Sequence, residues 1–299
     1  MGYFNGIYAA SLSILDNNLQ LDCEKTLKHA ENLIEKGCHG VIFFGSTGQS
    51  QLISLSEKIK LINILPKSKH KDKFIIGTGL NSLGDNINLL NISKSIGFEN
   101  FLVMPPAYYK YNDDDVFNFY SKLIENVKDC GIILYNFEKL SGYKFSVKCV
   151  SKLAKSFPKN VLGVKDSSYN LYENLKIENF SVMPGSESKL LKGLELGCSG
   201  IITATTNVTS YLARDVYDKF KNNLNQTSNE KLCMVRSIFD KYNLISGLHT
   251  FMSTEDSDFK NLIPPLKLLS KDEEKLFFSE LDKLNLSLIH ISEPTRPRL

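Results

Sequence analysis

The residue of this sequence with the most suggestive chemistry is Lys165, within residues 161–168. It ends a short apolar run that is typical of a buried parallel strand. Burying an ammonium group costs free energy unless the group is paired or neutral. A neutral amine is a nucleophile that can form a Schiff base with a carbonyl compound. The alternative is a lysine just past the strand end that reaches solvent.

Hydroxyl groups stand at the ends of two other predicted strands. Gly45-Ser46-Thr47-Gly48 ends the second strand, and Tyr135 lies at the end of the fifth. Ser46 and Thr47 offer hydroxyl and backbone N–H donors that suit a carboxylate. The phenol of Tyr135 can relay protons. Each group alone also fits an ordinary turn or a packed aromatic. Together with the amine, they supply what a reaction on an α-keto acid requires.

Short apolar runs alternate with amphipathic stretches over the first 224 residues. Eight runs predict strands at 6–14, 40–44, 74–80, 101–106, 131–136, 161–166, 180–185 and 200–205. The clearest helices are 25–36, 56–65, 113–129, 147–157, 188–196 and 211–224. Apolar strands separated by helices indicate a parallel sheet covered on both faces. Eight such units predict a (β/α)8 TIM barrel with the active site at the C-terminal strand ends. A doubly wound open sheet is the alternative.

The alternation stops after residue 224. Residues 230–244 and 271–284 each predict one helix, so we expect 225–285 to form an all-helical appendage on the catalytic barrel of residues 1–224. Residues 286–299 resemble translated adapter DNA, and we expect them to be a non-native tail. On that interpretation His290 and Arg296 have no function.

Composition excludes several classes of function. The chain has 299 residues, of which 42% are hydrophobic, and a formal net charge of only +3. No basic block indicates nucleic acid or a membrane surface as a partner. No apolar run reaches the roughly 18 residues of a membrane-spanning helix. The scattered cysteines and the absence of a signal-peptide pattern favour a reduced, cytoplasmic protein. No ligand cluster indicates a metal site.

Four motifs together resemble the signature of the dihydrodipicolinate synthase / N-acetylneuraminate lyase family. They are Gly45-Ser46-Thr47-Gly48, Tyr135-Asn136, Ser141-Gly142 and Gly163-Val164-Lys165-Asp166-Ser167-Ser168. The resemblance implies a (β/α)8 barrel with a C-terminal helical domain, assembled as a homotetramer or a homodimer. It implies a lyase without metal or other cofactor, whose lysine forms a Schiff base with pyruvate or a similar 2-oxo acid. Members make or break a carbon–carbon bond with an aldehyde, and some dehydrate sugar acids instead.

The resemblance also implies roles for the reactive residues. Lys165 is similar to the Schiff-base lysine, and Tyr135 to the proton-relay tyrosine. Ser46 and Thr47 resemble the pair that holds the pyruvate carboxylate and links to the tyrosine. These four positions describe the pyruvate half of a site.

Other positions match residues nearer the second substrate or a second subunit. Tyr108, or Tyr109 in the alternative register, resembles the tyrosine that the synthases insert into a neighbouring subunit's site. Gly185 and Ile202 match positions whose backbone lines the pyruvate pocket. Glu187 lies where the sialic acid lyases carry polar groups for the sugar chain, without clearly reproducing that set.

The sequence departs from the synthases at Leu140. The synthases carry an arginine there to bind the carboxylate of aspartate semialdehyde, and an aliphatic side chain cannot do so. Lys139 is next to it, but on an extended chain neighbouring side chains point to opposite sides, so we expect Lys139 to face away. A 2-keto-3-deoxy sugar acid or a sialic-acid-like substrate is therefore favoured.

Three other functions remain open from the sequence. The chain could be a 4-hydroxy-tetrahydrodipicolinate synthase of lysine biosynthesis, or a sugar-acid dehydratase on the same scaffold. It could also be a binding protein that has kept the barrel and lost catalysis. The presence of both Lys165 and Tyr135 argues against the last of these.

Overall fold

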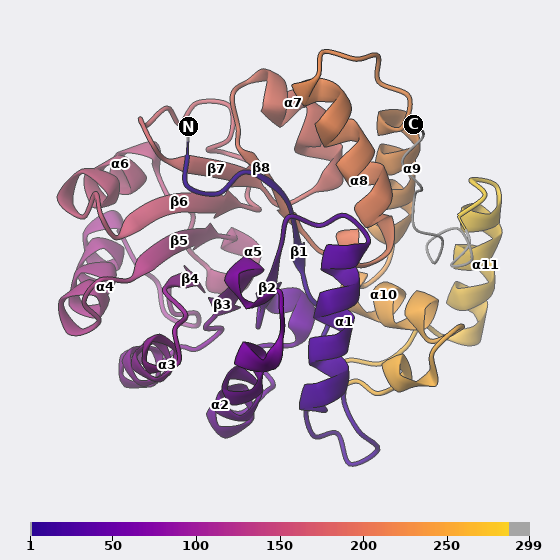
Figure 1. Ribbon diagram of the computed structural model, residues 1–299, viewed down its shortest axis with the longest axis horizontal. Helices are drawn as coiled ribbons and strands as arrows, with labels where there is room; N and C mark the ends of the chain where they lie inside the picture. Colours follow the sequence, from indigo (N-terminus) through magenta and orange to yellow (C-terminus); the bar gives the residue numbers. More distant parts are fainter. Residues whose placement is uncertain (1, 287–299) are drawn as a thin grey trace.

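Eight parallel strands form a ring in the computed structural model, which describes residues 2–286 (Figure 1). They are β1 (Gly6–Ala10), β2 (Gly40–Phe43), β3 (Phe74–Gly77), β4 (Asn100–Val103), β5 (Gly131–Asn136), β6 (Val161–Asp166), β7 (Ser181–Pro184) and β8 (Gly200–Thr203). Hydrogen bonding follows chain order from β1 to β7, and β8 pairs with β1. The predicted (β/α)8 barrel is confirmed, and the open doubly wound sheet is wrong.

The ring lacks a continuous hydrogen-bonded ladder at one junction, between β7 and β8. These two strands are the first and the last in the order of hydrogen-bonded neighbours. The two strands contact each other, and the Ser199 N–H donates to the Val182 carbonyl at 3.0 Å near their N-terminal ends. Over the described residues the paired ladder does not continue between them toward the C-terminal ends. We call this junction the β7–β8 seam.

Helices surround the ring (Figure 1). They are α1 (Cys23–Glu35), α2 (Leu55–Ile64), α3 (Leu83–Ser95), α4 (Asp113–Asn126), α6 (Val147–Ser156), α7 (Leu190–Glu195) and α8 (Thr206–Lys221), with a short α5 (Glu138–Ser141) after β5. Local signals set their starts. Asn112 caps α4 by accepting the N–H groups of Asp114 and Asp115, and the acidic first turn complements the helix dipole. Within the described residues no helix is long and apolar enough to span a membrane.

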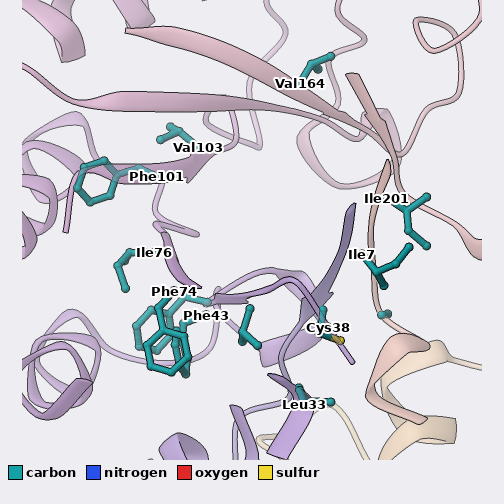
Figure 2. Close-up of a cluster of buried hydrophobic side chains, with 14 of the residues drawn as sticks. Ile7, Leu33, Cys38, Phe43, Phe74, Ile76, Phe101, Val103, Val164 and Ile201 are labelled. Atoms are coloured by element: carbon teal, nitrogen blue, oxygen red, sulfur yellow. The ribbon is translucent and has the colours of Figure 1, made fainter. Parts of the chain in front are cut away.

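Strand side chains divide into an outer and an inner cluster. Ile7, Phe101 and Ile201 belong to the outer cluster, on the side of the strands that faces the helices (Figure 2). Their neighbours in sequence, such as Leu102 and Ile202, fill the centre of the barrel. This is the alternation of a sheet buried on both faces.

A bulge in β6 decides which way the lysine points. Val161 and Gly163 pair with consecutive residues of β5, which leaves Leu162 as an extra residue. A bulge of this kind re-aims the side chains that follow it. Val164 packs outward, so Lys165 enters the barrel. Strict alternation counted from Val161 would direct this lysine outward instead.

Three further helices, α9 (Asn229–Phe239), α10 (Leu244–Met252) and α11 (Lys271–Asp282), follow the barrel and lie on its α8 side (Figure 1). The helix expected over 230–244 is present as α9, but it ends at Phe239, and residue 244 begins α10 instead. The chain leaves α9 after Phe239, and Asn243 then caps α10 by accepting the N–H groups of Ile245 and Ser246. A strong N-cap competes with helix continuation at such a position.

The expected division of the chain at residue 224 falls between α8 and α9, and it remains a proposal. Leu286, the first residue of the predicted non-native tail, is buried against the hydrophobic core. The rest of that predicted tail, 287–299 with His290 and Arg296, lies outside the described residues.

Candidate active site

Lys165 and Tyr135 meet inside the barrel at its C-terminal end. They are register partners on β6 and β5, and Met183 on β7 is the register partner of Lys165 on its other side. Lys165 is only 3% exposed, and its Nζ lies 4.2 Å from the centroid of the Tyr135 ring. The bulge in β6 and the pairing of β5 with β6 therefore place an amine over an aromatic face within a buried centre.

The Tyr135 hydroxyl is linked to the turn after β2. Its oxygen lies 3.0 Å from the Ser46 hydroxyl, with which it shares a hydrogen bond. Ser46 begins a short 3-10 turn, and Thr47, the next residue, is buried. Gly48 completes the turn, where a Cβ atom would lie 2.8 Å from the Ser11 carbonyl oxygen. The close approach explains the glycine and fixes the turn whose Ser46 hydroxyl bonds to Tyr135.

Asp166 and Asn136, which follow the lysine and the tyrosine, hold the strand ends together. Asp166 is fully buried and accepts the side-chain amide of Asn136 at 2.8 Å. It also accepts the N–H groups of Leu171 and Tyr172, at 2.8 and 2.9 Å. The Asp166 carboxylate thus accepts hydrogen bonds from the backbone N–H groups of the segment that follows β6. Sequence reasoning assigned it no role, although an acid beside a buried lysine was a usable signal.

Ile202 of β8 borders the same centre, and Gly185 directly follows β7. Ile202 is fully buried in the inner cluster with Tyr135. The Gly185 N–H donates to the Asp166 carbonyl at 2.9 Å, and a Cβ atom at Gly185 would lie 2.2 Å from the Ser167 hydroxyl. A side chain at residue 185 would therefore require Ser167 to shift.

Tyr108 and Leu140 do not join this cluster within one chain. The Tyr108 ring is 89% exposed and packs edge-on against Tyr109, at 5.2 Å between centroids. Leu140 is exposed on α5. The extended chain expected at Lys139 and Leu140 is wrong, because α5 is a turn of helix. Successive side chains there lie about 100° apart rather than on opposite sides.

Glu187 is buried and already paired. Its Oε2 atom lies 2.9 Å from the Nη1 atom of Arg236 on α9, and it accepts the Thr203 hydroxyl at 2.7 Å. Burial opposes the charge of Arg236, but Glu187 and Asp240 raise the pKa of the guanidinium above its ordinary value. Sequence reasoning missed Arg236, since the contact joins residues 49 apart in sequence.

A second buried lysine, Lys58 on α2, differs from Lys165 in its surroundings. Its Nζ donates to the carbonyls of Thr78 at 2.7 Å and Gly79 at 3.3 Å. Burial lowers the pKa of Lys58 from 10.5 to about 7. Its amine is held by the backbone after β3, whereas that of Lys165 lies over the Tyr135 ring. Of these two buried amines, that of Lys165 is the one beside Tyr135.

Within residues 2–286, no group of three or more histidine, cysteine, aspartate or glutamate side chains is arranged to hold a metal ion. The expectation that the reaction needs no metal stays a prediction.

Known proteins resemble this chain over nearly its full length. The sequence model of the Dihydrodipicolinate synthetase family matches residues 3–284. A 4-hydroxy-tetrahydrodipicolinate synthase from Methanopyrus kandleri is 28% identical over 96% of this chain and 98% of its own. An uncharacterized DapA-like lyase from Halobacterium salinarum is 23% identical over 94% of each chain.

Solved structures share the fold. A prophage protein of the dihydrodipicolinic acid synthase family from E. coli K12, in complex with pyruvate, superimposes with a TM-score of 0.86. It is 21% identical and covers 95% of this chain and 100% of its own. The synthase of Cyanidioschyzon merolae with lysine bound gives a TM-score of 0.88 at 18% identity over 96% of this chain and 100% of its own. With the family matched from residue 3 to residue 284, the chain belongs to the dihydrodipicolinate synthetase family and is a lyase on that family's barrel.

Proposed function

We propose that this lyase binds pyruvate or a close 2-oxo acid as a Schiff base on Lys165, and makes or cleaves a carbon–carbon bond to an aldehyde. The observation that carries the proposal is the cluster of Lys165, Tyr135 and Ser46 at one end of the barrel. The pyruvate complex of the E. coli relative supports the choice of oxo acid.

The cluster supplies each step of such a reaction. The Lys165 amine adds to the keto carbon and passes one of its protons to the keto oxygen, and the Tyr135 phenol gives that oxygen a second proton so that it leaves as water. The resulting iminium withdraws electrons, and loss of a proton from the neighbouring carbon gives an enamine. That carbon attacks the aldehyde, whose oxygen takes up a proton. Water then releases the product and restores the amine.

Ser46 and Thr47 are proposed to hold the carboxylate of the oxo acid. The Ser46 hydroxyl at 3.0 Å from Tyr135 provides the start of a proton path. Gly185 and Ile202 are proposed to line the oxo-acid pocket from β7 and β8. In this proposal neither a metal nor another cofactor takes part, because the iminium accepts the electrons.

The second substrate is proposed to be an aldehyde without a carboxylate, or a 2-keto-3-deoxy or sialic-acid-like sugar acid in the cleavage direction. Leu140 is apolar, and Lys139 beside it is exposed on α5. A bidentate arginine contact to a carboxylate contributes on the order of a hundredfold in specificity, which this chain lacks at residue 140.

Steady-state comparison of substrates with pyruvate tests this proposal. We expect aspartate semialdehyde to give a kcat/KM at least about tenfold below that of a hydroxylated aldehyde. If aspartate semialdehyde is the best substrate, the inference from Leu140 is wrong and the chain is a 4-hydroxy-tetrahydrodipicolinate synthase. If a sugar acid loses water without releasing pyruvate, the chain is a dehydratase.

Tyr108 is proposed to complete the site of a neighbouring subunit in a homotetramer or homodimer. Its backbone has a φ of 88°, a region that non-glycine residues rarely adopt, and its ring is exposed. Such strain is often found where function requires it. The cytoplasmic location expected from the cysteine pattern also stays a proposal.

A further inference from the structure

We propose that Arg236 of α9 is a positioning residue that holds the β7–β8 seam closed at the end of the barrel where Lys165 lies. The inference rests on the proposed function, because the two sides of the seam carry Gly185 and Ile202, the proposed lining of the oxo-acid pocket. It assigns a role in the site to a helix outside the barrel.

The seam needs a support that the backbone does not give. Every other neighbouring pair of strands in the ring is joined by a parallel ladder. Between β7 and β8, the Ser199 bond to Val182 lies near the N-terminal ends of the strands. At the C-terminal end the described backbone offers no ladder pairing, so side chains must hold the two strand ends together.

A buried network crosses the seam at that end. Glu187 follows β7, and Thr203 is the last residue of β8. The Thr203 hydroxyl donates to Glu187 Oε2 at 2.7 Å, which joins the two strand ends directly. Arg236 Nη1 donates to the same carboxylate oxygen at 2.9 Å and to Thr203 Oγ1 at 3.1 Å. It also approaches the carbonyl of Gly185 at 3.5 Å.

The buried negative charge of Glu187 needs the positive charge of Arg236 beside it. Glu187 is fully buried, and its second oxygen, Oε1, finds no partner among the described residues. Burying a carboxylate without an opposite charge costs free energy, and the Arg236 guanidinium offsets that cost. The Nε atom of Arg236 donates to Asp240 at 2.9 Å, which anchors the side chain on its own helix. One arginine thus links α9 to both strand ends.

The test uses Thr203→Val and Arg236→Lys. Valine keeps the shape of Thr203 and removes its hydrogen bonds to Glu187 and Arg236. Lysine keeps the charge of Arg236 but cannot reach Glu187, Thr203 and Asp240 together. Thr205→Val is the matched control, because the buried Thr205 hydroxyl has no partner among the described residues.

The readout is borohydride-trapped labelling of the protein as a function of pyruvate concentration. We expect the half-saturating pyruvate concentration to rise about tenfold in both variants, as loss of a hydrogen bond to a charged group would cause. The labelled fraction at saturation should stay that of wild type, and Thr205→Val should match wild type in both values. Unchanged half-saturation, with only the labelled fraction reduced, would mean that Arg236 merely stabilises the fold and would overturn the proposal.

A second readout does not depend on pyruvate. Amide hydrogen exchange in Thr203→Val should be faster at Gly185 and at residues 200–203 than in wild type, with α2 and α3 unchanged. Equal exchange at the seam would overturn the proposal even if the wild-type protein takes up no label. Absence of label in wild type contradicts the Schiff-base proposal alone.

Discussion

Replacing Tyr135 by phenylalanine separates a proton relay from a packed aromatic. The change keeps the ring beneath Lys165 and removes only the hydroxyl that lies 3.0 Å from Ser46. Loss of that hydrogen bond alone would cost about 1 kcal/mol, or roughly fivefold in rate. Loss of a general acid–base group costs about 10²–10⁴-fold. The two roles therefore differ by more than an order of magnitude.

We expect Tyr135→Phe to lower kcat by about 10²–10⁴-fold, measured as pyruvate release or consumption with the best aldehyde or sugar acid. Ser46→Ala, which leaves the phenol in place, should lose about tenfold or less. Tyr120→Phe is the control, because it removes another buried phenol, one that donates to the Val103 carbonyl at 2.8 Å instead of bonding to Ser46. It should alter thermal stability and leave kcat close to wild type. A Tyr135→Phe enzyme within a few fold of wild type would refute the relay.

Two further predictions concern acid and metals. Burial lowers the pKa of His29 and of His249 from 6.5 to about 4, so the folded protein resists protonation that the unfolded chain accepts. The free energy of unfolding should thus fall as pH drops from about 6.5 to about 4, by roughly 3 kcal/mol for each histidine. Urea unfolding midpoints that do not change between these pH values would contradict this prediction. Exhaustive chelation should leave activity intact, and a loss restored by a divalent ion would show that a metal is needed.

Much of the site follows from the sequence because parallel strands end at one face of a barrel. Ser46, Tyr135 and Lys165 each follow or end a different apolar run, so the barrel brings them together whatever their separation in sequence. Local sequence alone identifies the turn at Gly45–Gly48 and the strand ends at Tyr135 and Lys165 as candidate site residues.

The remaining features depend on contacts that a local pattern does not contain. The bulge at Leu162 arises from the pairing of β6 with β5, and without it Lys165 would point toward the helices. Arg236 reaches Glu187 only because α9 returns to the barrel after β8. The break between α9 and α10 depends on a cap at Asn243 that competes with an otherwise helical pattern.

The measurement that tests the central claim most directly is mass spectrometry after borohydride treatment with pyruvate. We expect one pyruvate-derived adduct per chain, located by peptide mapping at Lys165, and no adduct in Lys165→Ala. Lys58 is the internal control, because it is also buried and burial lowers its pKa to about 7. A wild-type protein without the adduct, or one labelled at Lys58 in place of Lys165, would contradict the account.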